Sequence, residues 1–365
     1  MAVNFALKYA KEIAKAFTHA SFVKPHTNNK MDFTGVKTVR MYQLVTVDEV
    51  DYKRTGANRY GEPKDIDDTV LEYTMERDKA FNGIVDKGDE KDQTIENKAG
   101  QWLRQQIREK STPNADKYYF RKVANFGHCA KIASAPAKNT IVELFADAQV
   151  WMDNHLVPSD GRLAYVPASQ FKLIVTSDQF LTLEKLGEKA MTRGEMGELM
   201  GFRLIKIPDS YLPQNCYFLC LHKGATALPY KISDTKIHKD PPGLSGALVE
   251  GRYYFDAFVF GEKADAVYAA CKSDAVLADV TPSGTAGAFK LTCTDAKLIR
   301  YTTDGSDPRF SATAQIATSG GTLDLAEGTK VRAIGLAYAG WGNNNTDEGK
   351  FPGAVIETTV AGAGG

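Results

Sequence analysis

Leu298-Ile-Arg-Tyr-Thr-Thr-Asp-Gly-Ser-Asp-Pro308 is a strand-forming run followed at once by a tight turn. The Asp304-Gly305 and Asp307-Pro308 pairs reverse the chain, because glycine tolerates positive φ, aspartate bonds to its own backbone and proline fixes φ. Further runs of alternating apolar residues flank the turn at 289–293, 323–325, 330–336 and 355–360. Short strands separated by turn signals predict a β-sandwich over residues 275–365.

Four motifs of this region match a known module. They are Thr281-Pro-Ser-Gly284, Tyr301-Thr-Thr-Asp-Gly-Ser-Asp-Pro308, Gly328-Thr-Lys-Val-Arg-Ala-Ile334 and Ala339-Gly-Trp341. On these motifs, the segment resembles the immunoglobulin-like module at the C-terminus of chitobiases and β-hexosaminidases. Such modules occur on enzymes and on surface proteins alike, so the resemblance implies a fold without an activity. If the module binds a glycan, we expect the contact at Trp341, Asn343 and Asn344, although core packing is the commoner fate of a sandwich tryptophan.

The charges of the chain balance, with 45 lysine and arginine residues against 45 aspartate and glutamate residues. This balance argues against a general binder of nucleic acid or of anionic membranes. No run approaches the length of a transmembrane helix, and the first residues lack the pattern of a signal peptide. We therefore expect a globular protein of two or three domains, made in a reducing cytoplasm.

The five cysteines are scattered, at positions 129, 216, 220, 271 and 293. Cys216 and Cys220 have only His222 nearby, so a metal site lacks donors at ligand spacing. We expect buried free thiols, with Cys216 and Cys220 on one face of a strand. No metal site and no cofactor is predicted.

The N-terminal region predicts a helix and an arm. Residues 4–20 carry apolar side chains at Phe5, Tyr9, Ile13 and Phe17, with lysines on the opposite face. A membrane-binding helix and a helix packed on its own domain are the alternatives. We favour docking on another protein, because the aromatic face is short and two-sided. Residues 21–35 follow neither period and predict an extended arm.

Two strand-like runs, 36–50 and 69–81, predict a long hairpin with a polar, charged tip at 51–68. Two-stranded ribbons are marginal in water. We therefore expect the hairpin strands to find support on a neighbouring subunit.

The middle of the chain mixes helical and strand patterns. A helix is predicted over 93–110, ended by Ser111-Thr-Pro113, and a second over 140–155 with Asn139 or Thr140 as its cap. Strands are predicted at 171–176, 202–207, 216–222 and 248–260. The alanine-rich stretch 264–278 predicts a domain boundary. We expect few contacts to cross it, so that a cut near Ala275 leaves the rest of the assembly intact.

This order of elements is similar to that of the major capsid proteins of tailed bacteriophages, whose Hong Kong-type fold is shared with the herpesvirus capsid floor. The local patches that carry the resemblance are Leu173-Ile-Val-Thr176, the segment 193–207 and Val249-Glu-Gly-Arg-Tyr-Tyr-Phe-Asp256. The resemblance implies an α+β capsid fold with an added sandwich. The implied division is an N-terminal arm at 1–35, an extended hairpin at 36–81, a peripheral domain with a spine helix at 82–143 and 241–270, an axial domain at 144–240, and an immunoglobulin-like sandwich at 275–365.

The implied function is a structural shell subunit. Such a subunit assembles with its own copies into pentamers and hexamers of a phage head, in the host cytoplasm, around double-stranded DNA held by non-specific contacts. The implied partners are portal, scaffolding or decoration proteins, with no membrane, and the sandwich is expected on the outer surface. The candidate contact residues between subunits are Phe5, Tyr9, Ile13, Phe17, Lys53, Arg54, Arg59, Lys64, Asp67, Arg193, Glu195 and Glu198.

No catalytic site is predicted. Glu195 and Glu198 share a face only in a helix, and the glycines around them favour a loop over a glycosidase pair. Asp65, Asp67 and Asp68 lack a glycine-centred calcium loop. The adjacent His128 and Cys129 are expected to point apart on a strand. Two rival functions stay open: a carbohydrate-binding or carbohydrate-active protein, and a phage tail or baseplate protein.

Overall fold

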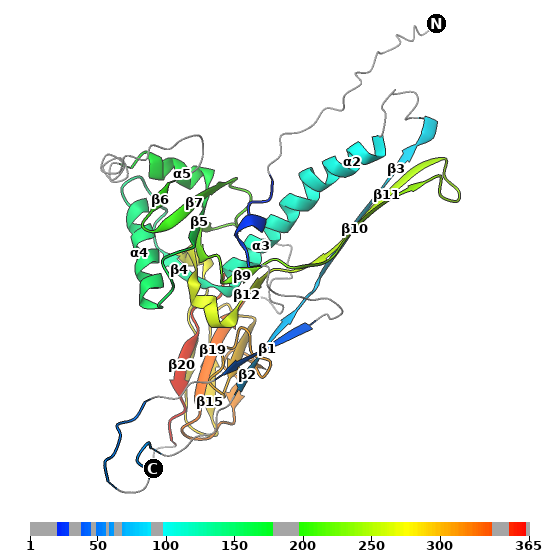
Figure 1. Cartoon of the computed structure of the whole chain (residues 1–365). Helices are drawn as coiled ribbons and strands as arrows, with labels where there is room; N and C mark the ends of the chain where they lie inside the picture. The colour runs from blue at the N-terminus through cyan, green and yellow to red at the C-terminus, as the bar shows by residue number, and fades with distance from the viewer. Residues whose placement is uncertain are drawn as a thin grey trace.

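The computed structural model describes residues 20–28, 38–44, 49–55, 58–61, 68–88, 98–177, 197–337 and 350–362. Three bodies surround one long helix (Figure 1). A six-stranded sheet with its helices lies on one side of the helix, a three-stranded ribbon runs out beside it, and a β-sandwich lies at the far end. The predicted α+β class with a C-terminal sandwich is confirmed.

The long helix, called the spine helix below, consists of α2 (Lys98–Gln106), a π-helical turn η2 (Ile107–Ser111) and α3 (Thr112–Phe126). The predicted helix end at Ser111-Thr-Pro113 is therefore wrong. A proline inside a helix removes one N–H and clashes with the carbonyl four residues earlier. Here Pro113 lies in the first turn of α3, directly after the wider π turn, in which the Thr112 N–H bonds to the Ile107 carbonyl. The proline is accommodated by this turn, and the helix continues.

The ribbon is an antiparallel sheet of three ten-residue strands in the order β10-β11-β3. The strands are β10 (Tyr230–Lys239), β11 (Gly246–Phe255) and β3 (Arg77–Asp86). Helix α2 covers one face, where Val85, Val249 and Ala99 form a small buried cluster. Trp102 packs edge-on against Phe81 with ring centroids 6.0 Å apart. The rest of the ribbon extends away from the body (Figure 1).

The predicted hairpin is confirmed for β1 (Thr38–Leu44) and β2 (Asp68–Thr74), which pair antiparallel from Thr38 opposite Thr74 to Leu44 opposite Asp68. The prediction for the rest of its second strand is wrong, because residues 77–81 belong to β3 and pair with β11 in the ribbon. The base of the hairpin is supported inside the subunit. Leu71 and Tyr73 of β2, and Met75 just after it, are buried in the largest core of the same chain. The expectation that a neighbouring subunit supports both strands is wrong for this part of β2.

The six-stranded sheet is mixed, in the order β4-β13-β8-β5-β7-β6. Its strands are β4 (His128–Ile132), β13 (Val267–Lys272), β8 (Cys216–His222), β5 (Arg162–Pro167), β7 (Phe202–Ile207) and β6 (Glu198–Leu199). Helices α4 (Ile141–Asn154) and α5 (Ala168–Val175) accompany it. The predicted strands at 202–207 and 216–222 are confirmed, and so is the helix predicted at 140–155.

Two details of this region differ from the predictions. Residues 171–175 lie in α5 and not in a strand, and Thr176 is the C-cap of that helix. The short run Phe171 to Val175 has no alternation that would distinguish strand from helix. The fully buried strand β5 precedes it. Thr140 occupies the cap position of α4, but its hydroxyl bonds to the Ala137 backbone and not to the helix N–H groups.

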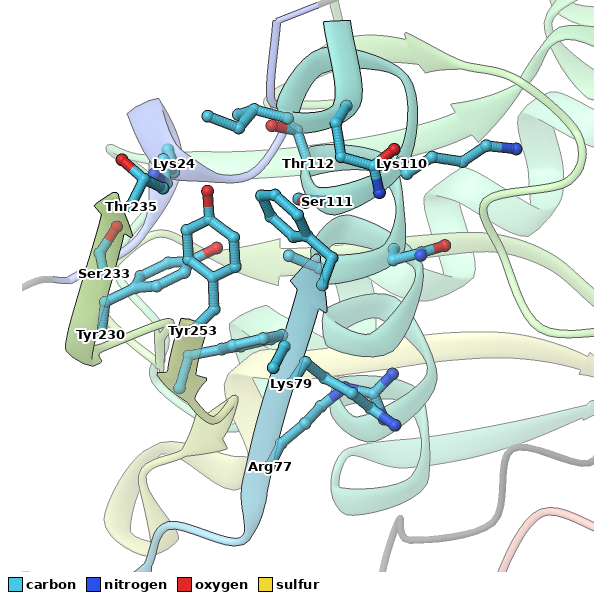
Figure 2. A pocket seen from close by; sticks show the side chains of 17 residues that line it. Lys24, Arg77, Lys79, Lys110, Ser111, Thr112, Tyr230, Ser233, Thr235 and Tyr253 are labelled. Carbon is cyan, nitrogen blue, oxygen red and sulfur yellow. The ribbon is translucent and has the colours of Figure 1, made fainter. Parts of the chain in front are cut away.

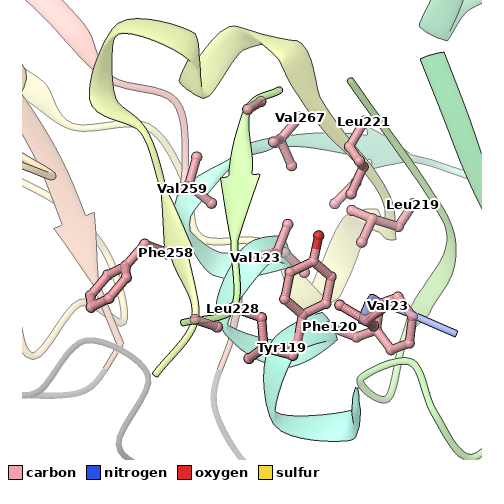
Figure 3. Close-up of a cluster of buried hydrophobic side chains, with 14 of the residues drawn as sticks. Val23, Tyr119, Phe120, Val123, Leu219, Leu221, Leu228, Phe258, Val259 and Val267 are labelled. Carbon is pink, nitrogen blue, oxygen red and sulfur yellow. The ribbon is translucent and has the colours of Figure 1, made fainter. Parts of the chain in front are cut away.

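Buried side chains cover both faces of the sheet. On one face, Tyr119 and Phe120 of α3 pack with Leu219 of β8 in the largest core (Figure 3). On the other, Phe145 of α4 stacks on Phe218 with ring centroids 4.3 Å apart. The spine helix and α4 therefore sandwich the sheet.

All five cysteines are free and buried, as predicted. Cys216 and Cys220 belong to different cores, so the expectation that they share a face is wrong. The register of β8 against β13 shifts between the pairs Ala270–Phe218 and Cys271–Cys216. The extra residue, Tyr217, reverses the alternation of side chains at this bulge.

The C-terminal sandwich has a three-stranded and a four-stranded sheet, in the orders β14-β15-β18 and β17-β16-β19-β20. The strands are β14 (Thr281–Ser283), β15 (Phe289–Thr292), β18 (Thr322–Leu323), β17 (Gln315–Ala317), β16 (Leu298–Thr302), β19 (Lys330–Leu336) and β20 (Ile356–Thr359). The sheets enclose a core that includes Phe289, Leu291 and Val331. The predicted turn is confirmed: Gly305 has a φ of +79°, and the Asp304 carboxylate accepts the Ser306 N–H at 3.0 Å.

Short elements join these bodies. They are η1 (Lys24–His26), β9 (Thr226–Ala227), β12 (Phe258–Val259), η3 (Gly261–Ala266) and η4 (Ser273–Ala275). The expectation that few contacts cross the boundary at 264–278 is wrong. Phe310 of the sandwich and Phe351 belong to the largest core of the body, and the Lys131 ammonium lies 2.9 Å from the Asp279 carboxylate.

Candidate assembly surfaces

The hairpin tip presents cations and aromatic rings to solvent. Lys53, Arg54 and Arg59, predicted as contact residues, are all exposed, and the Lys53 N–H bonds to the Arg59 carbonyl at 2.9 Å. Tyr52 and Tyr60 meet edge-on at 4.9 Å, and Tyr60 is 85% exposed. The predictions missed this tyrosine pair, although aromatic residues are enriched at protein interfaces.

Of the other predicted contact residues, one lies in the described part of the chain. Glu198 is exposed on β6, at the edge of the six-stranded sheet, opposite Arg203 of β7. The remaining candidates lie outside the described residues; they are Phe5, Tyr9, Ile13, Phe17, Lys64, Asp67, Arg193 and Glu195. The same holds for the candidate glycan contacts Trp341, Asn343 and Asn344.

The ribbon face that points away from α2 is exposed along its length. Ile84 is 65% exposed there. Charged pairs lie beside it: the Arg252 guanidinium grips the Asp78 carboxylate through two bonds of 2.6 and 3.1 Å, and His238 lies 3.2 Å from Glu250. These pairs are half-exposed, and exposed pairs contribute at most about 1 kcal/mol each. The ribbon therefore draws little stability from its own outer face.

A cationic pocket of about 530 Å³ lies between the ribbon, the π turn and η1 (Figure 2). Its basic side chains are Lys24, Arg77, Lys79 and Lys110, and no acidic side chain of the described chain lines it. Tyr230 and Tyr253 add aromatic walls. Because the four cations come from three separate segments, with Arg77 and Lys79 together on β3, no local motif marks the pocket.

Two of these cations are held against aromatic rings. The Arg77 guanidinium lies 4.1 Å from the centre of the Tyr118 ring, and the Lys24 ammonium lies 4.5 Å from that of Tyr230. Burial lowers the pKa of Arg77, although nearby Tyr118 and Asp256 oppose this effect. An incoming carboxylate would therefore meet fixed positive charge in a partly desolvated site.

A buried ionic network attaches the chain segment that follows β2, at Glu76, to the spine helix. Asp256 accepts bonds from the Lys122 ammonium, the Tyr118 hydroxyl at 2.8 Å and the Glu76 N–H at 2.9 Å. Lys122 and Asp256 are almost fully buried. Burial, followed by the charge of Asp256, raises the pKa of Tyr118 far above its usual value. The network joins α3, the β2–β3 corner and the residue that follows β11.

A second buried carboxylate anchors the N-terminal arm. Asp116 of α3 accepts the Ser21 hydroxyl at 2.7 Å and the Phe22 N–H at 2.9 Å. Burial raises the pKa of Asp116, and the two hydrogen bonds act in the opposite direction. The arm is thereby tied to the spine helix just before η1.

The one adjacent pair of candidate nucleophile and base is separated by the sheet. Cys129 faces the core beneath α3, whereas the His128 ring stacks on Trp151 of α4 with centroids 3.6 Å apart. Among the described residues, no group of three or more His, Cys, Asp or Glu side chains is placed to hold a metal ion. In that part of the chain no helix has the length and apolarity to cross a membrane.

Comparison with known proteins identifies the fold. The family described as "Fn3 associated" matches residues 289–346, within the sandwich. The chain superposes on a structure from Mycobacterium phage Che8 with a TM-score of 0.61 and 18% identity, over 73% of this chain and 98% of the other. It superposes on the capsid of cyanophage P-SCSP1u with a TM-score of 0.61 and 13% identity, over 74% and 93%. This chain has the phage capsid fold.

The matched capsid structures cover about three quarters of this chain and not all of it. The capsid of an empty GTA particle matches 74% of this chain and 100% of its own length, with a TM-score of 0.52 and 11% identity. About a quarter of this chain is thus additional to these capsid folds. No curated protein sequence matches the chain.

Proposed function

We propose that this chain is the major capsid protein of a phage, a structural and non-enzymatic subunit of the virion. Its copies assemble through pentamers and hexamers into an icosahedral or prolate head around double-stranded DNA. The observation that carries the proposal is the capsid fold combined with a ribbon whose outer face the subunit leaves uncovered. A shell subunit needs such reach, because each copy must contact several others.

Charge complementarity suggests how one subunit engages the next. The hairpin sequence after Gly61 contains Glu62, Asp65, Asp67 and Asp68 against a single Lys64. The cationic pocket offers four basic side chains without an acidic one. We infer that the acidic part of one subunit's hairpin binds the pocket of its neighbour. Such complementary charges set register and partner choice more than they add affinity.

The net charge of zero suits the interior of a DNA-filled shell. A strongly basic wall would hold the polymer through many phosphate contacts, whose affinity rises steeply with the number of neutralised charges. We infer passive, non-specific contact with DNA. In the same arrangement the sandwich projects from the outer surface, where an independent core can stand in solvent. Portal, scaffolding or decoration proteins complete the particle.

The first test is assembly of the purified chain, followed by gel filtration and negative-stain electron microscopy. Rings of five or six copies, or closed shells, are expected. A stable folded monomer across a wide concentration range would overturn the proposal. Tubes or stacked rings alone would favour a tail protein instead.

The second test is a charge exchange. The double variant Lys79→Glu/Lys110→Glu and the double variant Asp65→Lys/Asp67→Lys are each expected to lose shell formation, and the combined variant is expected to regain it. Lys236→Glu, on the opposite face of the ribbon and already beside Asp234, is the matched control. Equal assembly by all variants would exclude the pocket as the hairpin's partner.

A further inference from the structure

A loop of the C-terminal sandwich reaches into the body between the end of the spine helix and the base of the hairpin. We name residues 304–313 the docking loop. The Arg309 guanidinium donates to the carbonyl of Phe126, the last residue of α3, at 2.9 Å. The Phe310 ring lies 5.5 Å from that of Phe126, centre to centre. The loop therefore caps the spine helix.

The same loop contacts the hairpin. Ser311 forms an isolated antiparallel bridge with Leu71 of β2. Phe310 and Leu71 both lie against Gly261, so closely that a methyl group there would come within 3.1 and 3.2 Å of the two side chains. The Tyr73 hydroxyl accepts the Gly261 N–H at 2.9 Å. Spine helix, hairpin base and docking loop thus meet at one point.

The docking loop is held in shape by its own bonds. The Arg309 guanidinium grips the Asp307 carboxylate through bonds of 2.7 and 3.1 Å, and both side chains are mostly buried. Arg300 of β16 donates to the Ser311 carbonyl at 3.3 Å. Asp304 accepts the Thr313 hydroxyl. Because these bonds hold the docking loop rigidly on its sandwich, the loop connects the hairpin base rigidly to the sandwich.

A second attachment closes the other side of the junction. The Phe351 N–H bonds to the Ala275 carbonyl at 2.7 Å, and the Leu277 N–H bonds to the Phe351 carbonyl at 2.9 Å. Two attachments prevent free rotation about the linker. The sandwich is consequently part of the subunit's rigid frame.

From these contacts we propose that the sandwich positions the hairpin: the docking loop fixes the direction in which β1 and β2 leave the body. In this role the docking loop holds the hairpin in one orientation, and Phe310 and Ser311 are the positioning residues. It deepens the proposed capsid role, because hairpin direction would decide which subunit is reached. It does not depend on that role for its first test.

The first test is hydrogen–deuterium exchange on the full chain carrying Phe310→Ala. Phe310 lies outside the sandwich's own core cluster, so the sandwich is expected to stay folded. The β2 amides are expected to exchange at least tenfold faster, while those of β19 keep their rate. Ile316→Ala, an exposed residue of the same sandwich, is the matched control. Unchanged exchange in β2 would overturn the proposal, as would equal acceleration across both regions.

The second test locks the contact. Paired residues of an antiparallel bridge have Cα atoms about 4.5–5.5 Å apart, within the range that a disulfide spans. The variant Leu71→Cys/Ser311→Cys, oxidised, is expected to slow β2 exchange and to reverse the effect of Phe310→Ala. Failure of the locked variant to restore protection would count against positioning by the loop.

Assembly provides a separate outcome. Phe310→Ala is expected to lower the yield of closed shells at least fivefold, and the oxidised lock to restore it. If the unmodified chain forms neither rings nor shells, the capsid proposal fails while the exchange result still decides the role of the loop. If shells of the Phe310→Ala variant are normal despite faster β2 exchange, hairpin direction is not set by the sandwich during assembly, and the proposal is overturned.

Discussion

The sandwich and the ribbon are both antiparallel β-structure, yet they differ in burial: the sandwich buries the inner faces of its two sheets, and the ribbon leaves one face exposed. The sandwich closes two sheets over a core in which Leu291 and Val331 are fully buried. The ribbon has strands of ten residues, and most of β10 is exposed. A single sheet covered on one face by a short helix leaves the other face to solvent or to a partner. The sandwich covers its apolar surface within one chain, whereas one face of the ribbon stays exposed in that chain.

The difference separates stability from assembly. Substitutions in the sandwich and the body should change the unfolding free energy of a single subunit. Substitutions on the outer ribbon face should leave that free energy nearly unchanged and alter association. The following experiments test this separation, from the largest expected effect to the smallest.

Asp256→Ala is expected to destabilise the body by about 3–5 kcal/mol, because it leaves the buried Lys122 ammonium without its partner. Asp78→Ala, which breaks the exposed pair with Arg252 on the ribbon, is expected to cost less than about 1 kcal/mol. Urea unfolding of dissociated subunits measures both. Equal costs would mean that the ribbon pair is as important to the fold as the buried network.

Leu291→Ala is expected to destabilise the sandwich by about 2–5 kcal/mol, through lost burial and a residual cavity. Ile84→Ala on the ribbon is expected to change subunit stability by less than about 0.5 kcal/mol. Calorimetry gives the stabilities, and light scattering gives the assembly yield. The comparison breaks down if Ile84→Ala unfolds the subunit.

The body and the sandwich junction are expected to respond to different pH ranges. Burial lowers the pKa of His128 from 6.5 to about 4, so the stability from the neutral ring is present above pH 6.5 and lost as the pH falls to 4, by roughly 3 kcal/mol. Burial alone would raise the pKa of Asp307, but Arg309 holds it below 3.8, so this contribution is lost only at lower pH. Unfolding midpoints from pH 7 to 3 measure both; His128→Phe should remove the first loss and keep the second.

Some of this architecture was predictable because its signals are local. The Asp-Gly and Asp-Pro turn and the runs at 298–302 and 330–336 specify strands through neighbouring residues, and β16 and β19 match them. The junction was not predictable in this way. Arg309 meets Phe126, which is 183 positions away, and nothing in either local sequence marks the contact.

The candidate contact residues show the same limit. Charges at the hairpin tip were readable from composition, and Lys53 and Arg54 are exposed as a contact surface requires. The cationic pocket brings Lys24, Lys79 and Lys110 together from three segments. Only the folded chain places them within one cavity, so a scan for local motifs passes over them.

Among the ribbon substitutions, Gly83→Ala is expected to have the smallest effect on assembly. A methyl group at this position would lie 2.6 Å from the Trp102 ring, so the ring must shift, at a cost of about 1 kcal/mol. Trp102 fluorescence should change while assembly remains, because the glycine lies beneath α2 and not on the outer face. Loss of assembly would show that the position of α2 also matters to the contacts between subunits.

Because of the π turn at Ile107–Ser111, the two halves of the spine helix direct their apolar faces toward different sheets. An α-helix advances about 100° per residue, so one extra residue in a turn rotates all that follows by about that angle. Before the turn, Ala99 and Trp102 face the ribbon; after it, Tyr119 and Phe120 face the six-stranded sheet. Deleting a single residue there would keep the helix and swing the ribbon around its axis. The number of residues in this turn thus sets the angle between the ribbon and the six-stranded sheet. Insertions and deletions would change that angle in steps of about 100°, whereas point substitutions would leave it unchanged.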